Sequence, residues 1–243
     1  MSTEPIYKAI RLIIGQNGAS KLLDIGAGEG NLIIRLKARN ELLDCYACDY
    51  YSEPFQIQGV PFKKIDLDER PLPYNDAEFD IVTASEVIEH LHNPRNLVRE
   101  SYRILKKDGL FVLTTPNILN MKSRLRYLFS GFYNLFGPLS LVKNDKSSSD
   151  GHIMPIGYIY LHFMLWKEGF RDISFTIDKA QKSSTALWFF FSPLRFVGKR
   201  HFIKKEKKKY KTLDGSNFDL TMEMFKKRLL TGRTLIMTAR KVS

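Results

Sequence analysis

Apolar runs alternate with amphipathic stretches along the first half of the chain. The run at 22–25 precedes a glycine-rich turn and then residues 31–36, where apolar side chains recur at helical spacing; residues 4–14 show the same spacing and end before Gly15. Strand-like runs follow at 44–49, at 62–67, within 78–91 and within 105–117, the last preceded by a predicted helix end and glycine turn at 105–109. Strands that alternate with helices indicate a parallel sheet with helices on both faces.

The alternation breaks after Pro116. Residues 117–150 are rich in aromatic and aliphatic side chains, and a polar stretch runs from 144 to 151, which predicts an apolar helical insertion with a mobile loop. Residues 157–168 predict a helix, and 173–177 and 234–239 predict the last two strands. We expect the chain, 1–243, to form a single domain with an aromatic and basic insertion at 183–227 between those strands.

Length and composition agree with one α/β domain. The chain has 243 residues, of which 44% are hydrophobic, enough for one core. Residues 1–8 lack the cationic lead and apolar core of a secretory signal, and no apolar run approaches the roughly 20 residues that span a bilayer. We therefore expect a cytoplasmic protein. Cys45 and Cys48 lie three residues apart in a predicted strand, so they should face opposite sides of the sheet as ordinary core residues.

The turn after the first apolar run reads Gly26-Ala27-Gly28-Glu29-Gly30 and closely follows Asp24. Glycine is required where a side chain would keep a ligand from lying against the backbone. The third glycine comes one residue earlier than in the loop of dinucleotide binders, and Asp24 would repel a pyrophosphate. An acid here suits a ligand with a cationic amino-acid end. The loop resembles the first motif of the class I S-adenosylmethionine (SAM) methyltransferases.

Downstream motifs extend this resemblance over 22–117. Asp49 ends a predicted strand about 20 residues beyond the loop, where a ribose-binding carboxylate is expected, and Asp66 matches the acid that holds the adenine amino group in the family. The resemblance implies SAM as cofactor and a doubly wound, Rossmann-like sheet of seven mostly parallel strands, with a helical lid at 117–165 over the acceptor. The SAM-binding residues that it implies are Asp24, Gly26, Ala27, Gly28, Gly30, Asp49, Tyr50, Asp66, Leu67 and Ser85. The alternative is a Rossmann-like domain that binds another nucleotide.

The segment after the fourth predicted strand carries residue types suited to acid–base or metal chemistry. Glu86, Glu89 and His90 are spaced i, i+3 and i+4, which on a helix places them on one face. The Glu-x-x-Glu-His pattern resembles the O-methyltransferases of the ubiquinone pathway and the small-RNA 3′-end 2′-O-methyltransferases, in both of which it is associated with a divalent cation. The RNA family has a further histidine after a strand ending in Pro-Asn, and His152 lies in the comparable region.

Three interpretations of these residues remain open. Glu86, Glu89, His90 and His152 could bind Mg²⁺ or Mn²⁺ through carboxylate oxygens and imidazoles. His90 or His152, assisted by Glu89, could instead act as a metal-free general base that removes the proton of an acceptor hydroxyl. The side chains could also serve only to cap a helix and shape the pocket. His162 lies among apolar residues and is expected to pack in the core.

The formal net charge of +12 favours an anionic partner such as lipid, nucleic acid or a phosphorylated substrate. Nine lysines and arginines lie within 195–211, where Glu206 is the only acid, and the block 186–198 is dense in aromatic residues. An aromatic patch next to a cationic one is typical of a segment at a bilayer surface, so we expect 186–211 to contact anionic membrane peripherally. The alternative is an aromatic core hairpin with a solvated basic loop.

The acceptor is suggested by a further resemblance. Residues 117–136 and 150–155 resemble uncharacterised methyltransferases associated with bacterial surface-polysaccharide assembly. This resemblance implies O-methylation of a sugar or lipid-linked saccharide hydroxyl. A metal-dependent RNA 2′-O-methyltransferase is an alternative, although nucleic acid is the less favoured partner because no RNA-binding module is evident. A second alternative is a non-catalytic SAM-binding protein that is recruited to the membrane.

Overall fold

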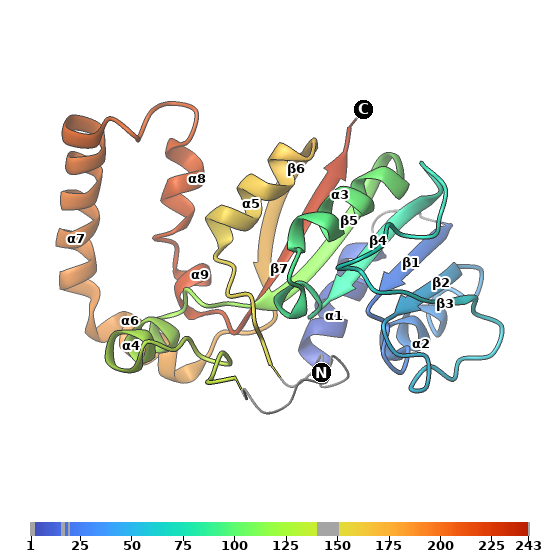
Figure 1. Cartoon of the computed structure of the whole chain (residues 1–243). Coiled ribbons are helices and arrows are strands. Elements are labelled where there is room, and N and C mark those ends of the chain that lie inside the picture. The colour runs from blue at the N-terminus through green and yellow to red at the C-terminus, as the bar shows by residue number, and fades with distance from the viewer. Residues whose placement is uncertain (1–2, 16–17, 19, 140–150, 243) are drawn as a thin grey trace.

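One sheet forms the centre of the computed structural model, which describes residues 3–15, 18, 20–139 and 151–242 (Figure 1). The strands are β1 (Lys21–Ile25), β2 (Asp44–Asp49), β3 (Phe62–Lys64), β4 (Phe79–Ser85), β5 (Leu105–Pro116), β6 (Phe170–Ile177) and β7 (Thr234–Lys241). Their order is β3-β2-β1-β4-β5-β7-β6. Neighbours among β1–β5 pair in parallel, and β7 runs antiparallel to both β5 and β6. The predicted sheet of seven mostly parallel strands is confirmed.

Helices cover both faces of this sheet. The longer helices are α1 (Glu4–Ile14), α2 (Asn31–Lys37), α3 (Pro94–Ile104), α4 (Met121–Ser130), α5 (Tyr158–Lys167), α6 (Lys182–Phe190) and α7 (Ser192–Lys205), and the shorter ones are η1 (Ile88–His90), η2 (Glu206–Tyr210), α8 (Phe218–Glu223) and α9 (Lys227–Thr231). The apolar faces of α1 and α2 bury one face of the sheet, and those of α3 and α5 bury the other. Because both faces are covered, the central strands are almost continuously apolar.

The alternation of side chains along each strand divides the core into two layers. In β1, Leu22 packs in the layer under α1 and α2, whereas Leu23 packs in the layer under α3 and α5. Cys45 and Cys48 of β2 are both buried and belong to these two different layers. The prediction that the two thiols face opposite sides of the sheet is confirmed.

β3 is shorter than the sequence pattern predicts and ends at Lys64. The amide of Ile65 still donates to the carbonyl of Asp49 (2.8 Å). The chain then turns, because the Asp66 carboxylate accepts a hydrogen bond from the amide of Asp68 (3.0 Å). This local side-chain bond replaces strand pairing with a turn.

The helix end predicted at 105–107 is wrong. α3 ends at Ile104, and Leu105 already pairs with Phe79 as the first residue of β5. The pairing then shifts register, and Asp108 adopts a φ of 63° within this irregularity. A lysine pair before a glycine turn is common at helix ends, so the sequence alone favoured the wrong element.

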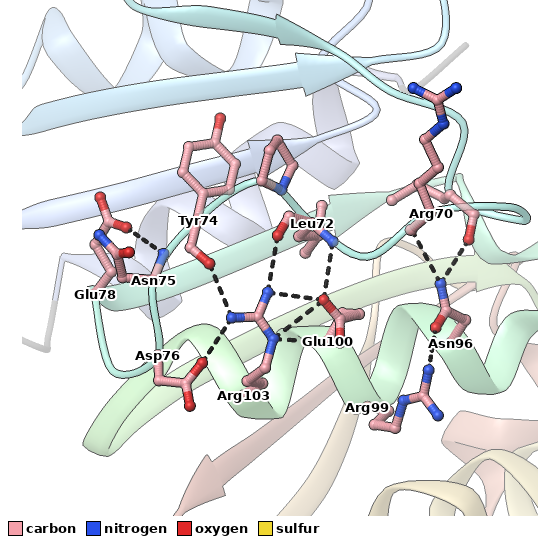
Figure 2. A network of polar contacts seen from close by, with 12 residues as sticks. Arg70, Leu72, Tyr74, Asn75, Asp76, Glu78, Asn96, Arg99, Glu100 and Arg103 are labelled. Atoms are coloured by element: carbon pink, nitrogen blue, oxygen red, sulfur yellow. Dashed lines mark hydrogen bonds and ion pairs between the residues drawn. The ribbon is translucent and has the colours of Figure 1, made fainter.

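A polar network holds the loop between β3 and β4 on α3 (Figure 2). Arg103 donates to the carbonyls of Leu72 and Tyr74 (2.8 Å each) and forms ion pairs with Asp76 (2.7 Å) and Glu100 (2.8 Å). Glu100 is buried and also accepts from the amide of Leu72 (2.9 Å). These charge-assisted bonds fix the loop whose first residues are candidates for SAM binding.

The region predicted as a lid, 117–165, contains α4 and α5. α4 lies at the end of the sheet where β5 finishes, whereas α5 packs on a sheet face (Figure 1). The polar stretch predicted as a mobile loop lies outside the described residues, except for Gly151. His162 on α5 is half-buried, with its ring centroid 5.9 Å from that of Tyr158.

The segment between β6 and β7 is helical. Residues 186–198 belong to α6 and α7, which Phe191 joins, so the alternative of an aromatic core hairpin is wrong. α6 is seated against α4 and α9, whereas α7 has no buried residue and leads away from the sheet (Figure 1). No helix within the described residues combines the length and the apolar character needed to cross a bilayer.

Candidate active site

The glycine turn after β1 packs closely against the end of β2 and against neighbouring apolar side chains. The amide of Gly26 donates to the carbonyl of Cys48 (2.8 Å), and a Cβ on Gly26 would lie 2.3 Å from Val87. A Cβ on Gly30 would lie 2.2 Å from Ile57. At Gly28, by contrast, a Cβ would meet no atom within 4 Å. All three glycines have positive φ, so the turn leaves an open cradle above Gly28 in a conformation that other residues rarely adopt.

Asp24 is buried beside this cradle. Its side chain accepts a hydrogen bond from the Thr83 hydroxyl (2.7 Å) across the pair formed by β1 and β4. Burial raises the pKa of Asp24 to about 7; the bond from Thr83 opposes the shift, and the charge of Asp49 adds to it. A cation beside the carboxylate would return it to the ionised form. The ammonium group of SAM is a cation of this kind.

Asp49 closes the cradle from the end of β2. Its carboxylate accepts hydrogen bonds from the amides of Gly28 (2.7 Å) and Tyr51 (3.2 Å). The adjacent Tyr50 is exposed, and its ring packs edge-on against that of Tyr51 with centroids 4.9 Å apart. Asp49, the residue predicted to bind the ribose, therefore lies next to the glycine turn.

Asp49→Ala should weaken SAM binding by about 1.5–3 kcal/mol, because a carboxylate that bonds both ribose hydroxyls would be lost. Isothermal titration calorimetry with SAM measures this change. Asp44→Ala, at the exposed start of the same strand, is the matched control and should bind as wild type. Unchanged affinity in the Asp49 variant would reject its role.

The predicted adenine side of the site lies on the loop after β3. The carbonyl of Leu67 accepts from the Asn96 side chain (2.8 Å). The Asp68 carboxylate accepts from the amides of His92 (3.1 Å) and Asn93 (2.7 Å). The loop that carries Asp66 is thereby joined to the turn after η1.

Ser85 and Glu86 stand where β4 ends, and the helix predicted to carry Glu86 is wrong. Glu86 has a φ of 58° and precedes the three-residue helix η1. Its amide donates to the Thr114 hydroxyl (3.0 Å), which also lies 3.2 Å from the Ser85 hydroxyl. Burial raises the pKa of Glu86 to about 7. Glu86 therefore faces β5 and does not share a helical face with His90.

Glu89, His90 and His152 come together at the same edge. One oxygen or nitrogen atom of each lies within 4.8 Å of the corresponding atoms of the other two. The rings of His90 and His152 meet edge-on with centroids 4.9 Å apart. The amides of Ile153 and Met154 donate to the Glu89 carbonyl (2.9 and 3.0 Å), which fastens the segment bearing His152 to η1.

The protonation state of His90 follows from its hydrogen bond. Its Nδ1 lies 3.1 Å from the carbonyl of Gly151. A carbonyl only accepts, so the proton is on Nδ1, and Nε2 of the neutral ring has a free lone pair. Burial lowers the pKa of His90, and burial together with His90 lowers that of His152 to about 4. Both imidazoles are therefore neutral near pH 7.

Glu89 is fully buried, and neither of its carboxyl oxygens has a hydrogen-bond partner among the described residues. Burial raises its pKa well above the ordinary value. Protonation of Glu89, or a cation bound beside it, would each remove the cost of burying an unpaired negative charge. Two imidazoles and a carboxyl group fit a divalent cation if the cluster contracts slightly, since bonds of about 2.0–2.2 Å bring ligands closer than 4.8 Å. Glu86 is not part of this cluster.

Three contacts of the site were not predicted from the sequence. Thr83 is a polar residue within an apolar strand, and that interruption was a usable signal. Gly151 acts through its carbonyl, which leaves no trace in the sequence. Phe136 is buried with its ring centroid 5.0 Å from that of His152, but it belongs to a segment with many aromatic residues and was not distinguished from them.

Comparison with known proteins places this arrangement in a family. A family model described as a methyltransferase domain matches residues 6–143, more than half of the 243 residues. A probable SAM-dependent methyltransferase of Mycobacterium tuberculosis is 43% identical over 102 residues, which cover 41% of this chain and 36% of the relative. A ubiquinone/menaquinone biosynthesis C-methyltransferase of Citrifermentans bemidjiense is 26% identical over 129 residues, 48% of this chain and 55% of the relative.

The matched segments thus span about half or less of these relatives. A solved SAM-dependent methyltransferase from Archaeoglobus fulgidus has a TM-score of 0.60 and 17% identity, with 99% of this chain and 95% of that chain covered. At this identity the likeness shows the fold alone. The family match covers the glycine turn, Asp49, Asp66 and η1. The chain belongs to the family of class I SAM-dependent methyltransferase domains.

Proposed function

We propose that this protein transfers the methyl group of SAM to an oxygen atom, the hydroxyl of a sugar or lipid-linked saccharide, with His90 as the general base. The observation that carries the proposal is the bond from His90 Nδ1 to the carbonyl of Gly151, because it leaves the Nε2 lone pair free to accept a proton. His90 comes from η1, directly after β4, at the edge of an α/β sheet where ligands bind.

SAM supplies an electrophilic methyl carbon when it is bound. The residues of the chain must then orient the acceptor and remove its proton. His90 takes up the hydroxyl proton at Nε2 as the oxygen attacks, and His152 holds the ring of His90 in place. Phe136 packs on His152 and keeps water from this side of the pair. Asp24 and Asp49 belong to the SAM side of the edge and take no part in the proton transfer.

The sugar acceptor is supported by the resemblance of 117–136 and 150–155 to methyltransferases of surface-polysaccharide assembly. A carbon acceptor is the competing reaction, since one of the relatives is named a C-methyltransferase. An RNA 2′-hydroxyl is supported by the net charge of +12. Methylation of a carbon atom or of an RNA 2′-hydroxyl also requires removal of a proton. The three reactions are therefore distinguished by their methylated products and not by the presence of a general base.

A divalent cation is the second candidate for activating the hydroxyl. The buried, unpartnered carboxyl group of Glu89 favours it, since a cation there would neutralise the charge. Glu89, His90 and His152 would be its ligands, and the cation would lower the pKa of a bound hydroxyl. Mg²⁺ and Mn²⁺ are the cations that we expected, and the two imidazoles favour Mn²⁺ of the two.

The test uses SAM labelled in its methyl group and four acceptor fractions: lipid-linked saccharides, free polysaccharide, RNA and quinone precursors. We expect label on a saccharide oxygen, in a reaction that EDTA does not inhibit. Label confined to RNA or to a ring carbon would overturn the acceptor assignment. Inhibition by EDTA that Mn²⁺ reverses would replace the metal-free base with the metal. SAM binding without transfer to any fraction would favour the non-catalytic alternative.

A further inference from the structure

Large apolar side chains stand exposed in the last turns of two neighbouring helices. In α4, Leu128 is 74% exposed and Phe129 is 80% exposed; in α6, Phe189 is 61% exposed and Phe190 is 77% exposed. Single exposed apolar residues are ordinary, but pairs of large ones on two adjacent helices are typical of an interaction site.

α4 and α6 are fixed to each other at their first turns. The Asn120 side chain, which caps α4, accepts a hydrogen bond from the Ser184 hydroxyl (3.1 Å). The amide of Lys122 in turn donates to that hydroxyl (3.2 Å). Asn120 and Ser184 are both buried. The helices lie side by side where β5 and β6 end (Figure 1), so the exposed last turns belong to one helix pair.

α7 continues the apolar surface and adds charge. It follows α6 at Phe191, and Leu194, Phe196 and Val197 are exposed on its first two turns. Lysine and arginine number fourteen along 121–139 and 179–211, and Glu206 is the only acid there. Exposed aliphatic and aromatic side chains among cations match the boundary between acyl chains and anionic head groups.

We propose that the last turns of α4 and α6, together with α7, form one face that docks on an anionic lipid bilayer. We call these elements the docking face. RNA would use the same cations, but Leu128, Leu194 and Val197 cannot stack on bases as aromatic platforms do. Insertion into the acyl boundary makes use of aliphatic and aromatic residues alike.

The structure also changes which aromatic residues of 186–211 should insert. Trp188 is half-buried, with its ring under the guanidinium of Arg195 (4.4 Å) and the ammonium of Lys227 (5.1 Å). Phe191 is half-buried at the junction of α6 and α7. Phe189 and Phe190 are exposed although each packs edge-on against one neighbouring ring, and the exposed Leu128 and Phe129 lie outside the segment that the sequence analysis singled out.

A short path leads from the docking face to the histidine pair. Tyr127, in the last turn of α4, stacks on Tyr133 with ring centroids 4.4 Å apart, and three residues later Phe136 packs on His152. A lipid-borne acceptor would therefore approach His90 from the membrane side. This last step rests on the proposed function, whereas docking itself requires no methyl transfer.

Co-sedimentation with vesicles of phosphatidylglycerol and phosphatidylcholine tests the proposal at low salt. Wild-type protein should bind them and should bind pure phosphatidylcholine at least about tenfold more weakly. Leu128→Ser with Phe129→Ser, and separately Phe189→Ser with Phe190→Ser, should each lower binding at least about tenfold. Tyr160→Ser with Phe163→Ser removes exposed aromatics from α5 and should bind as wild type.

Circular dichroism and SAM titration establish that each variant is folded, which separates this test from failure of the proposed reaction. A parallel titration with single-stranded RNA should show no loss in the serine variants. Wild-type protein that does not bind anionic vesicles overturns the proposal. So does vesicle binding that the α4 and α6 variants retain, because charge alone would then account for it. Loss of RNA binding in the same variants would assign the face to nucleic acid.

Discussion

His90→Gln should lower the turnover number about 10²- to 10⁴-fold, the range expected when a general base is removed. Glutamine has an amide that can still donate to the carbonyl of Gly151, but it has no basic nitrogen at the position of Nε2. Affinity for SAM should not change, because the predicted SAM ligands lie on β1, β2 and the loop after β3. Single-turnover transfer of labelled methyl groups, with calorimetry of SAM binding, measures the two effects separately.

His92→Gln provides the matched control, since His92 is exposed and lies only two residues away. It should retain wild-type turnover. If His90→Gln also retains it, His90 is not the base. If turnover falls in His90→Gln and EDTA inactivates the wild type until Mn²⁺ is added, His90 acts as a ligand instead. A metal-free base predicts a rate that EDTA leaves unchanged.

The SAM side of the site could be predicted because its residues lie close to strand ends. Gly28 lies in the turn that follows β1, and Asp49 ends β2. Parallel pairing of β1 with β2 brings the two residues together, as the 2.7 Å bond between them shows. Register and chain order fix such contacts with little freedom. A local motif therefore carried most of the information about this half of the site.

The acceptor side depended on contacts that no local pattern contains. His90 and His152 are 62 positions apart and meet because the amides of Ile153 and Met154 bond to the Glu89 carbonyl. Spacing correctly placed Glu89 close to His90, but it also placed Glu86 with them. The left-handed backbone of Glu86 removes it from that group, and a helical spacing rule has no means of anticipating such a residue.

The helices α6 and α7 were not predicted from the sequence, for a different reason. Helical periodicity becomes visible when one face of a helix is buried and the other is solvated. α6 buries only Ser184, and α7 buries no residue. Neither helix therefore has a continuous buried apolar face. The aromatic residues without periodicity belong to helices with several exposed large apolar side chains, and these exposed side chains are also the basis for the docking face.

Asp24→Asn should make the ligand-free protein more stable at pH 8 by up to about 4 kcal/mol. This difference in stability corresponds to the shift from an ordinary pKa of 3.8 to a folded-state pKa of about 7. Because the folded-state pKa is the higher one, the stability that Asp24 contributes is complete below about pH 4 and is lost as the pH rises through about 7. Asparagine keeps an oxygen that accepts from Thr83 and does not ionise, so urea unfolding of the variant should lack this pH dependence.

SAM should reverse the difference in stability between Asp24→Asn and the wild type. If the ammonium of SAM lies beside Asp24, binding restores the ionised carboxylate, and wild-type protein should gain more stability from SAM at pH 8 than Asp24→Asn does. The variant should bind SAM at least about tenfold more weakly, as expected for loss of a charge-assisted contact. Equal stability of the two proteins at pH 8 would show that burial does not raise the pKa of Asp24. Equal SAM affinity would instead show that the buried acid serves the fold and not the methionine end of the ligand.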